Sequence, residues 1–155
     1  MTVRLLARNE SARKGLYRSD ALARLAAGIL DSEGVAEEAE VSVLFCDDPF
    51  MRELNRQYRK KDAPTDVLSF CQDAPPPGEV RALGDIVISL ETVAGHHPGD
   101  PAAMRREVRL LFCHGMLHLL GYDHTNARDR DIMAAKQAAA LGVPAGEAWR
   151  HGTSG

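Results

Sequence analysis

Segments with the hydrophobic spacing of helices alternate along the chain with segments that have the spacing of strands. Apolar residues recur at helical intervals over residues 19–34, which predicts an amphipathic helix. Aspartate–proline pairs at residues 48–49 and 100–101 each predict the start of another helix, because proline fits the first helical turn. The second of these helices is predicted to be long and to reach Leu120. A last helix is predicted over about residues 127–141.

Four short segments have the composition and alternation of strands. They are residues 2–6, 41–45, 67–70 and 86–89. The proline-rich residues 74–78 can form neither a helix nor a central strand, so we expect a surface loop there. Because strands and helices are interleaved, the predicted fold class is α/β in the broad sense (α+β), with a small central mixed sheet of about four strands packed by helices.

Length and composition indicate one ordinary domain. The chain has 155 residues, of which 45% are hydrophobic and 26% are charged, so we expect residues 1–155 to form a single domain. The apolar runs are too short to span a membrane and the N-terminus lacks a signal-peptide pattern, which favours a cytoplasmic protein with no membrane partner. The three cysteines lack CxxC spacing, and we expect them to be buried reduced thiols: Cys46, Cys71 and Cys113.

Charge is unevenly distributed along the chain although the net charge is −3, and residues 51–61 hold a compact basic cluster. The cluster lies on and just after the helix that begins at residue 48, and its members are Arg52, Arg56, Arg59, Lys60 and Lys61. A basic helix of this kind favours contacts with the phosphates of a polyanion. The aromatic content of only 5% argues against a surface that stacks many bases.

The segment HGMLHLLGYDH, residues 114–124, has the spacing of a metal site. His114 and His118 are four residues apart in the predicted long helix, so both imidazoles project from one face. Gly121 then allows the chain to turn toward His124, which reproduces the histidine spacing of the metzincin metalloproteases. Three neutral imidazoles leave a fourth ligand position open, which is typical of catalytic rather than structural zinc.

The residue after the first histidine separates this segment from those proteases. They place a glutamate there as general base, whereas this chain has Gly115. A zinc ion with three neutral ligands keeps its full charge, which suits an anionic substrate such as a phosphodiester. A glycine inside a helix also indicates that something approaches the backbone closely, which supports the metal site, although close contact with another helix is an equally good explanation.

Three carboxylates are candidates for orienting the histidines, namely Asp85, Glu107 and Asp123. For Asp85 and Glu107 an ordinary turn or surface role is the favoured interpretation. For Asp123, hydrogen bonding within its own turn is the simpler one. The pair His96-His97 precedes a proline and is expected in a loop, with no ligand role.

Three blocks of the sequence resemble the bacterial YbeY family: residues 114–124, residues 58–70 (YRKKDAPTDVLSF) and residues 84–89 (GDIVIS). The resemblance covers about residues 40–142. Members of that family are zinc-dependent, single-strand-specific endoribonucleases that act in ribosomal RNA maturation, including the 3′ end of 16S rRNA, and in ribosome quality control.

The resemblance implies a zinc ion, one per chain, held by His114, His118 and His124. It further implies that Arg59 is the catalytic residue, in agreement with the bidentate fit of a guanidinium to a phosphate. The implied partners are single-stranded RNA, above all ribosomal RNA, and the ribosome or ribosomal proteins. Sequence selection is expected to come from a partner or from RNA shape. No oligomeric state is favoured.

Two other functions stay open at this point. One is a metal-dependent hydrolase of another substrate class, in particular a peptidase, and a carboxylate within reach of the metal would favour it. The other is a ribosome-assembly factor that binds RNA without cutting it and in which zinc is structural.

Overall fold

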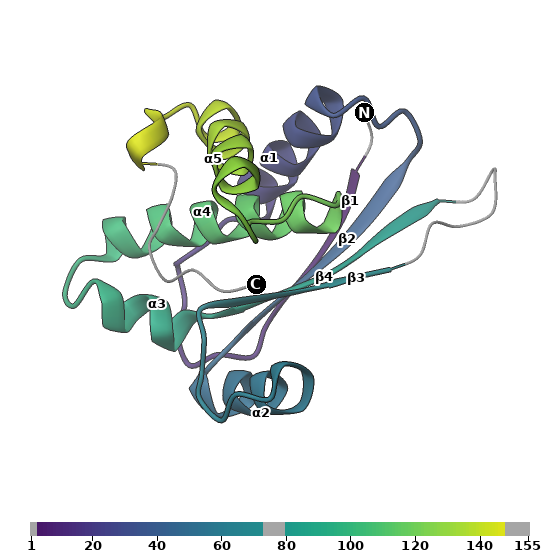
Figure 1. The fold of residues 1–155 in the computed structure, drawn as a ribbon. Helices are drawn as coiled ribbons and strands as arrows, with labels where there is room; N and C mark the ends of the chain where they lie inside the picture. Colours follow the sequence, from purple (N-terminus) through teal and green to yellow (C-terminus); the bar gives the residue numbers. More distant parts are fainter. Residues whose placement is uncertain (1–2, 73–79, 148–155) are drawn as a thin grey trace.

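The computed structural model describes residues 3–72 and 80–147, which fold around one four-stranded sheet (Figure 1). In chain order the elements are β1 (Val3–Asn9), α1 (Ser19–Ser32), β2 (Ala39–Cys46), α2 (Asp48–Arg59), β3 (Val67–Cys71), β4 (Arg81–Ser89), α3 (Leu90–His96), α4 (Pro101–Leu119), α5 (Ala127–Leu141) and the short 3-10 helix η1 (Ala145–Glu147). The predicted α+β class and the four-stranded mixed sheet are confirmed.

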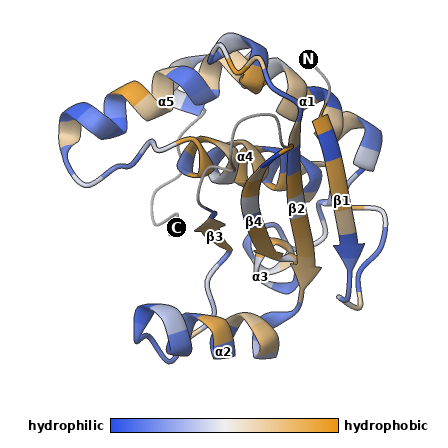
Figure 2. Ribbon diagram, turned by 90° about the vertical axis from the view of Figure 1, so that its right-hand side faces the viewer, coloured by the Kyte–Doolittle hydropathy of each residue, from blue (hydrophilic) through white to orange (hydrophobic). Residues whose placement is uncertain are grey.

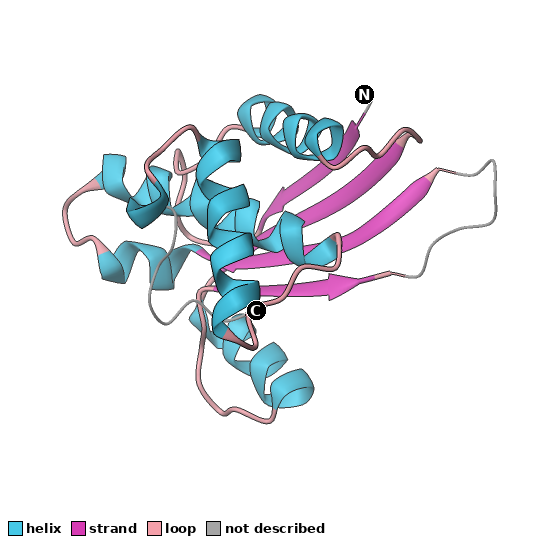
Figure 3. Cartoon of the chain, turned by 45° about the horizontal axis from the view of Figure 1, so that its top comes forward, coloured by secondary structure: helices cyan, strands magenta, loops and turns pink. Residues whose placement is uncertain are grey.

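The strand order in the sheet is β1-β2-β4-β3. β1, β2 and β4 run parallel, whereas β3 pairs antiparallel with β4 and forms one edge (Figure 3). In this register Ser69 lies opposite Ile86, and Phe70 lies opposite Asp85. Because side chains alternate along a strand, the members of each pair lie on one face of the sheet, and the two pairs lie on opposite faces.

Helices cover both faces of the sheet. α1, α4 and α5 lie on one side and α2 lies on the other (Figure 1). The larger core fills the space between the sheet and α1 and α4, with Phe45, Ile86 and Phe112 fully buried. A smaller core lies between α2 and the opposite face, around Met51 and Leu68. Apolar colouring covers most of β2 and β4 (Figure 2). β4 is buried along most of its length, whereas alternate residues of β2 are only half-buried.

Gly115 is the point at which α4 approaches the sheet most tightly. A Cβ atom at this position would lie 2.9 Å from Cγ2 of Ile86 on β4, closer than two carbons pack. The close approach predicted for this glycine is therefore confirmed, but the neighbour is a strand of the sheet and not another helix. It presses the second half of α4 against the sheet and holds the helix that carries His114 and His118 in a fixed position.

Several boundaries differ from the predictions. β1, β2 and β4 extend beyond the predicted strands, and α3 occupies a segment for which no helix was predicted, so that His96 ends a helix. The sequence holds no turn residue between β4 and α3, and Ser89 serves both as the last strand residue and as the helix cap. Residue 2 and the proline-rich residues 74–78 lie outside the described residues.

The prediction for the cysteines is partly wrong. All three thiols are free, and Cys46 and Cys113 are buried as expected, but Cys71 is exposed. It lies at the end of the edge strand β3, where the sheet has no further strand to cover it.

Candidate metal centre

The three histidines of residues 114–124 come together at the end of α4 and the loop that follows it. His114, His118 and His124 each offer a ring nitrogen, and the three nitrogens lie within 4.8 Å of one another. The Nε2 atoms of His114 and His118 are 3.0 Å apart. Helical spacing places the first two on one face of α4, and the turn at Gly121, where φ is +101°, brings in the third.

Two neutral carbonyl groups fix the tautomers of the first two histidines. Nδ1 of His114 lies 2.7 Å from Oε1 of Gln137 on α5, and Nδ1 of His118 lies 2.8 Å from the backbone oxygen of Tyr122. Since both oxygens only accept, each Nδ1 carries a hydrogen and donates it. Each Nε2 therefore presents a lone pair toward the other histidines, as a metal ligand does.

The environment keeps these two imidazoles neutral. Burial, together with the nearby His118, lowers the pKa of His114 to about 3. Burial also lowers the pKa of His118, with a further contribution from the nearby His124. Two neutral rings with lone pairs facing each other at 3.0 Å repel, and a cation between them removes the repulsion. Zinc ligands in tetrahedral geometry lie about 3.3 Å from one another, so the cluster can hold such a metal ion with little movement.

Contacts from α1 and α5 hold the loop after α4 in place. The hydroxyl of Tyr122 donates to the carboxylate of Glu33 at the end of α1, and Nζ of Lys136 on α5 lies 2.9 Å from the same carboxylate. The carbonyl of Tyr122 that receives His118 Nδ1–H is thereby tied to two helices. Sequence reasoning missed both Gln137 and this network, because their partners lie far away along the chain.

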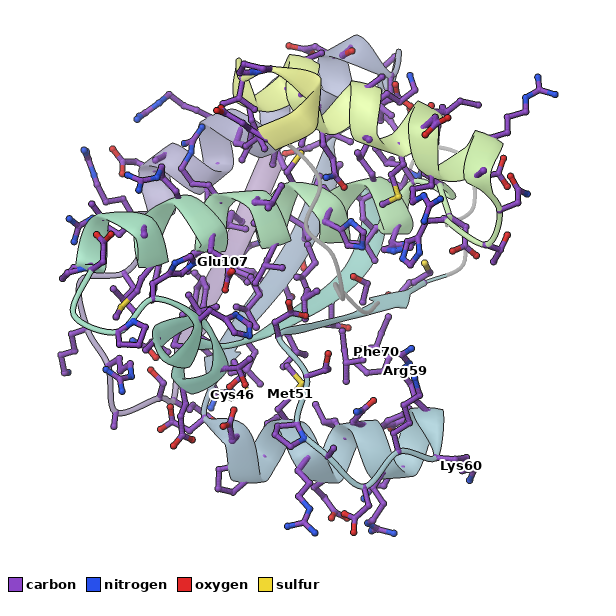
Figure 4. The ribbon with its side chains drawn as sticks, turned by 60° about the vertical axis from the view of Figure 1, so that its left-hand side comes forward. Cys46, Met51, Arg59, Lys60, Phe70 and Glu107 are labelled. Atoms are coloured by element: carbon purple, nitrogen blue, oxygen red, sulfur yellow. The ribbon has the colours of Figure 1, made fainter. Side chains whose placement is uncertain are left out.

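A pocket connects the histidine cluster to the end of α2. It is lined by Tyr58, Arg59, Leu68, Ser69, Phe70, Asp123, His124 and Thr125. In Figure 4 the side chain of Arg59 rises from the end of α2 toward the sheet, beside Phe70. The positive charge of Arg59 also contributes to the lowered pKa of His118, so the guanidinium acts on the cluster electrostatically. The structure thus brings Arg59 and the three histidines to one place, although they are 55 or more positions apart in the sequence.

Arg59 differs from its basic neighbours on α2. Arg52 makes a bidentate contact with Asp62, at 2.8 Å from Nε and 3.0 Å from Nη2, and Arg56 pairs with Glu53. These pairs neutralise much of the basic cluster expected from the sequence. Arg59 forms no ion pair within the described ranges, and its Nη1 atom is buried without a hydrogen-bond partner. A buried cationic donor without a partner indicates a place for an anion.

The structure corrects the expectations for two of the three carboxylates. Glu107 is buried and hydrogen-bonds His96 and His97, so it is neither a surface residue nor a support for the histidine cluster. Asp85 lies in the middle of β4 on the face toward α2, away from the cluster. Asp123 accepts the backbone N–H of His124 at 2.7 Å, in line with the simpler interpretation that it supports its own turn.

Gly115 leaves no room for the glutamate of the metalloproteases. Its position faces Ile86 on β4, where even a Cβ atom would clash. Among the residues that the structure describes, no carboxylate joins the group formed by the three histidines. The arrangement therefore lacks the base that a peptidase of that kind requires.

None of the helices in the described residues has the length and apolar character needed to span a membrane.

Comparisons with known proteins agree with one another. The family model described as "Endoribonuclease YbeY" matches residues 7–143. A protein of Pelotomaculum thermopropionicum named Endoribonuclease YbeY is 46% identical over 125 residues, which cover 78% of this chain and 82% of that protein. One of Moorella thermoacetica with the same name is 48% identical over 118 residues, or 71% and 76% of the two chains.

A solved structure shares the fold. The solution structure of TM1509 from Thermotoga maritima superposes with a TM-score of 0.56 at 26% identity and covers 90% of this chain and 87% of that one. The α+β fold with its four-stranded sheet thus occurs in a protein of clearly diverged sequence.

Proposed function

Because the chain belongs to the YbeY endoribonuclease family, we propose that it is a metal-dependent endoribonuclease that cleaves phosphodiester bonds in single-stranded RNA. Residues 1–155 act as one catalytic domain. The metal is zinc, one ion per chain, and its ligands are His114, His118 and His124. Arg59 is the catalytic residue that binds the phosphate to be cleaved.

The observation that carries this proposal is the convergence of three histidine nitrogens beside an arginine whose Nη1 atom is buried. A set of three neutral imidazoles is the ligand set of catalytic zinc sites, and neutral ligands leave the charge of the ion undiminished. When bound, zinc supplies Lewis-acid polarisation of a phosphoryl oxygen and a nucleophile derived from water at neutral pH. His124 and Arg59 line the same pocket, which supports a substrate that reaches the metal and the guanidinium at once.

The role of Arg59 follows from its charge and its surroundings. A guanidinium stays protonated at physiological pH and donates hydrogen bonds in a fork that matches two phosphate oxygens. With Arg52 and Arg56 paired to carboxylates, Arg59 is the arginine of α2 with a buried donor left for a ligand. In the proposed reaction it holds the phosphate against the metal centre and offsets the charge that develops on it.

The biological substrate in this proposal is ribosomal RNA. The role is ribosomal RNA maturation, including the 3′ end of 16S rRNA, and ribosome quality control, in contact with the ribosome or ribosomal proteins. Such a role places the protein in the cytoplasm. The curated relatives named Endoribonuclease YbeY support the reaction class, and the three sequence blocks support the finer role.

The two other functions considered from the sequence are less well supported. A peptidase would need a carboxylate base that neither Gly115 nor the described surroundings of the cluster provide. In an assembly factor with structural zinc, a fourth protein ligand would be expected to complete the coordination of the ion. Only three ligating side chains converge in the described part of the chain.

A cleavage assay on single-stranded RNA tests the proposal. The full chain is prepared with zinc, without metal, and as His114→Ala, with His97→Ala as a control that removes a histidine outside the cluster. We expect cleavage by the zinc-loaded protein and by His97→Ala, and none by the metal-free protein or by His114→Ala. Equal cleavage by all four preparations would contradict the metal dependence, and no cleavage by the zinc-loaded protein would contradict the reaction.

A further inference from the structure

The pocket beside the histidine cluster contains a second buried donor, the hydroxyl of Ser69. Its Oγ atom, like Nη1 of Arg59, is buried and has no hydrogen-bond partner. Both side chains line the same pocket, together with His124. A buried polar atom without a partner destabilises a protein. Two such atoms in one pocket are explained together if both bind the same ligand.

The sheet geometry shows which way Ser69 faces. Ser69 and Cys71 are two residues apart on β3 and therefore lie on the same face of the sheet. Sγ of Cys71 lies 3.5 Å from the backbone oxygen of His118, so this face is the one that meets α4. Ser69 lies opposite Ile86, which packs against Gly115. The hydroxyl is thus on the side of the sheet that carries the histidine cluster.

Arg59 approaches from the opposite side. It ends α2, which covers the other face of the sheet, and its side chain rises toward the sheet at Phe70 (Figure 4). Because β3 is an edge strand, no further strand separates the two faces at this point. The pocket therefore lies around the free edge of β3, with a hydroxyl on one side and a guanidinium on the other.

We propose that Ser69 and Arg59 together form a phosphate-binding subsite, in which the hydroxyl donates to one non-bridging oxygen of the substrate phosphate and the guanidinium donates to the other. Ser69 is then a substrate-binding residue. The inference rests on the proposed nuclease function and deepens it by naming a second group that contacts the phosphate.

The chemistry of the pocket favours a phosphate over other ligands. Both buried atoms can donate, and a phosphodiester offers two charged acceptors and no donor of its own. Asp123 is the one acidic residue among the lining residues, and its carboxylate is exposed and accepts the backbone N–H of His124. A cation would be repelled by the guanidinium and a neutral base would leave its charge uncompensated, whereas a phosphate satisfies both donors and neutralises the charge.

The test compares Ser69→Ala and Ser69→Thr with Ser42→Ala, all in the full-length chain. Ser42 is a matched control, because it lies on β2 opposite Asp85 and lines a different groove on the α2 side. Two binding readouts are used: the affinity of the metal-free protein for a short single-stranded RNA, and inhibition by inorganic phosphate of RNA cleavage by the zinc-loaded protein. Zinc content and melting temperature are measured for every variant.

We expect Ser69→Ala to weaken both RNA binding and phosphate inhibition by about tenfold, the effect of losing one hydrogen bond to a charged group. Ser69→Thr keeps the hydroxyl and retains most of the binding, and Ser42→Ala behaves as the original chain. The melting temperature of metal-free Ser69→Ala should not fall, because the hydroxyl has no partner to lose inside the protein. A purely structural serine would give the opposite result.

A double variant tests whether the two groups share one phosphate. If they do, the loss in Ser69→Ala/Arg59→Ala is smaller than the product of the two single losses, because either change already loosens the same group. Losses that multiply would contradict the shared subsite.

The outcomes separate this inference from the proposed function. If the zinc-loaded original chain cleaves RNA and Ser69→Ala binds RNA and phosphate equally well, the subsite is wrong and the nuclease proposal stands. If Ser69→Ala loses zinc, the serine acts on the metal cluster and the subsite is again wrong. If the original chain with full zinc does not cleave RNA, the proposed function itself fails.

Discussion

Two clusters of histidines lie against the same helix, α4, and they are built differently. At the end of α4, His114 and His118 meet His124 and donate their Nδ1 hydrogens to the carbonyl oxygens of Gln137 and Tyr122. Two turns earlier on α4, the carboxylate of Glu107 accepts hydrogen bonds from Nδ1 of His96 at 2.9 Å and from Nε2 of His97 at 3.3 Å. The first cluster thus has neutral acceptors around it, and the second has a carboxylate at its centre.

This difference decides what each cluster can do. Carbonyl acceptors leave the first set of imidazoles neutral with their free nitrogens facing one another, which suits a metal ion. In the second cluster the carboxylate occupies the centre, and within the described ranges its atoms do not form a group of three converging ligands. Glu107 lies between α4 and α3 (Figure 4), so its contacts fasten the two helices together. The number of histidines is therefore a poorer sign of a metal site than the atoms that they face.

Removing a histidine from each cluster gives the largest contrast. We expect His118→Ala to lose nearly all bound zinc and to cleave RNA about a thousandfold more slowly, since a metal ion supplies several kcal/mol of transition-state stabilisation. His97→Ala should keep both zinc and activity. Elemental analysis and initial rates measure the two effects. Full zinc in His118→Ala would show that the first cluster is not the metal site.

Arg59 lies beside the first cluster only, and we expect its replacement to have the second-largest effect on RNA cleavage. We expect Arg59→Ala to slow cleavage by about a hundredfold and Arg59→Lys by about tenfold, because lysine keeps the charge but loses the bidentate geometry. Zinc content should not change in either variant. The matched control is Arg52→Ala, which removes an exposed arginine paired with Asp62. If Arg52→Ala and Arg59→Ala slow cleavage equally, Arg59 has no special role.

Gln137 gives the first cluster a neutral amide oxygen as acceptor, where the second cluster has a carboxylate. Replacing Gln137 tests whether this acceptor matters for metal binding. Gln137→Ala removes the acceptor of His114 Nδ1–H, and we expect zinc affinity to fall by about 10- to 100-fold. Gln137→Glu places a carboxylate there, as in the second cluster, and should restore most of the affinity. Competition with a chelator measures both variants. Unchanged affinity in Gln137→Ala would mean that Gln137 does not orient the ligand.

Replacing Glu107 should lower the stability of the protein without changing its zinc content. Glu107→Ala leaves His96 and His97 without their buried partner, and we expect the free energy of unfolding to fall by about 1–3 kcal/mol. Urea denaturation of the zinc-loaded protein measures the loss, and elemental analysis should show the original zinc content. A loss of zinc without a loss of stability would reverse the roles assigned to the two clusters.

The smallest effect concerns pH in the metal-free protein. His114 has a pKa of about 3 in the folded chain and about 6.5 when unfolded, so below pH 6.5 the unfolded chain binds more protons. Stability should therefore fall as the pH drops below about 6.5, by about 1 kcal/mol per pH unit for this residue. His118 shifts in the same direction. Melting curves between about pH 7.5 and 5.5 test this, and His114→Gln should show a weaker pH dependence.

The histidine site was predictable because its geometry is local. Four residues in a helix place His114 and His118 on one face whatever the rest of the fold does, and a glycine just after the helix brings His124 back within a few residues. The absence of a glutamate after His114 was equally visible, and it pointed away from peptide hydrolysis. The class of fold followed from alternating strand and helix periods, which are also short-range properties.

The tertiary structure decided everything that depends on distant partners. Gln137 is an ordinary polar residue in its helix until packing of α5 on α4 places it against His114, and Glu107 has the pattern of a surface residue until α3 folds over it. Likewise, Ser69 and Arg59 meet the histidines only because β3 takes the edge of the sheet, in an order that no local pattern specifies. Hydrophobic periodicity determines which face of an element is buried, but the neighbour that covers that face is chosen by packing of the whole chain.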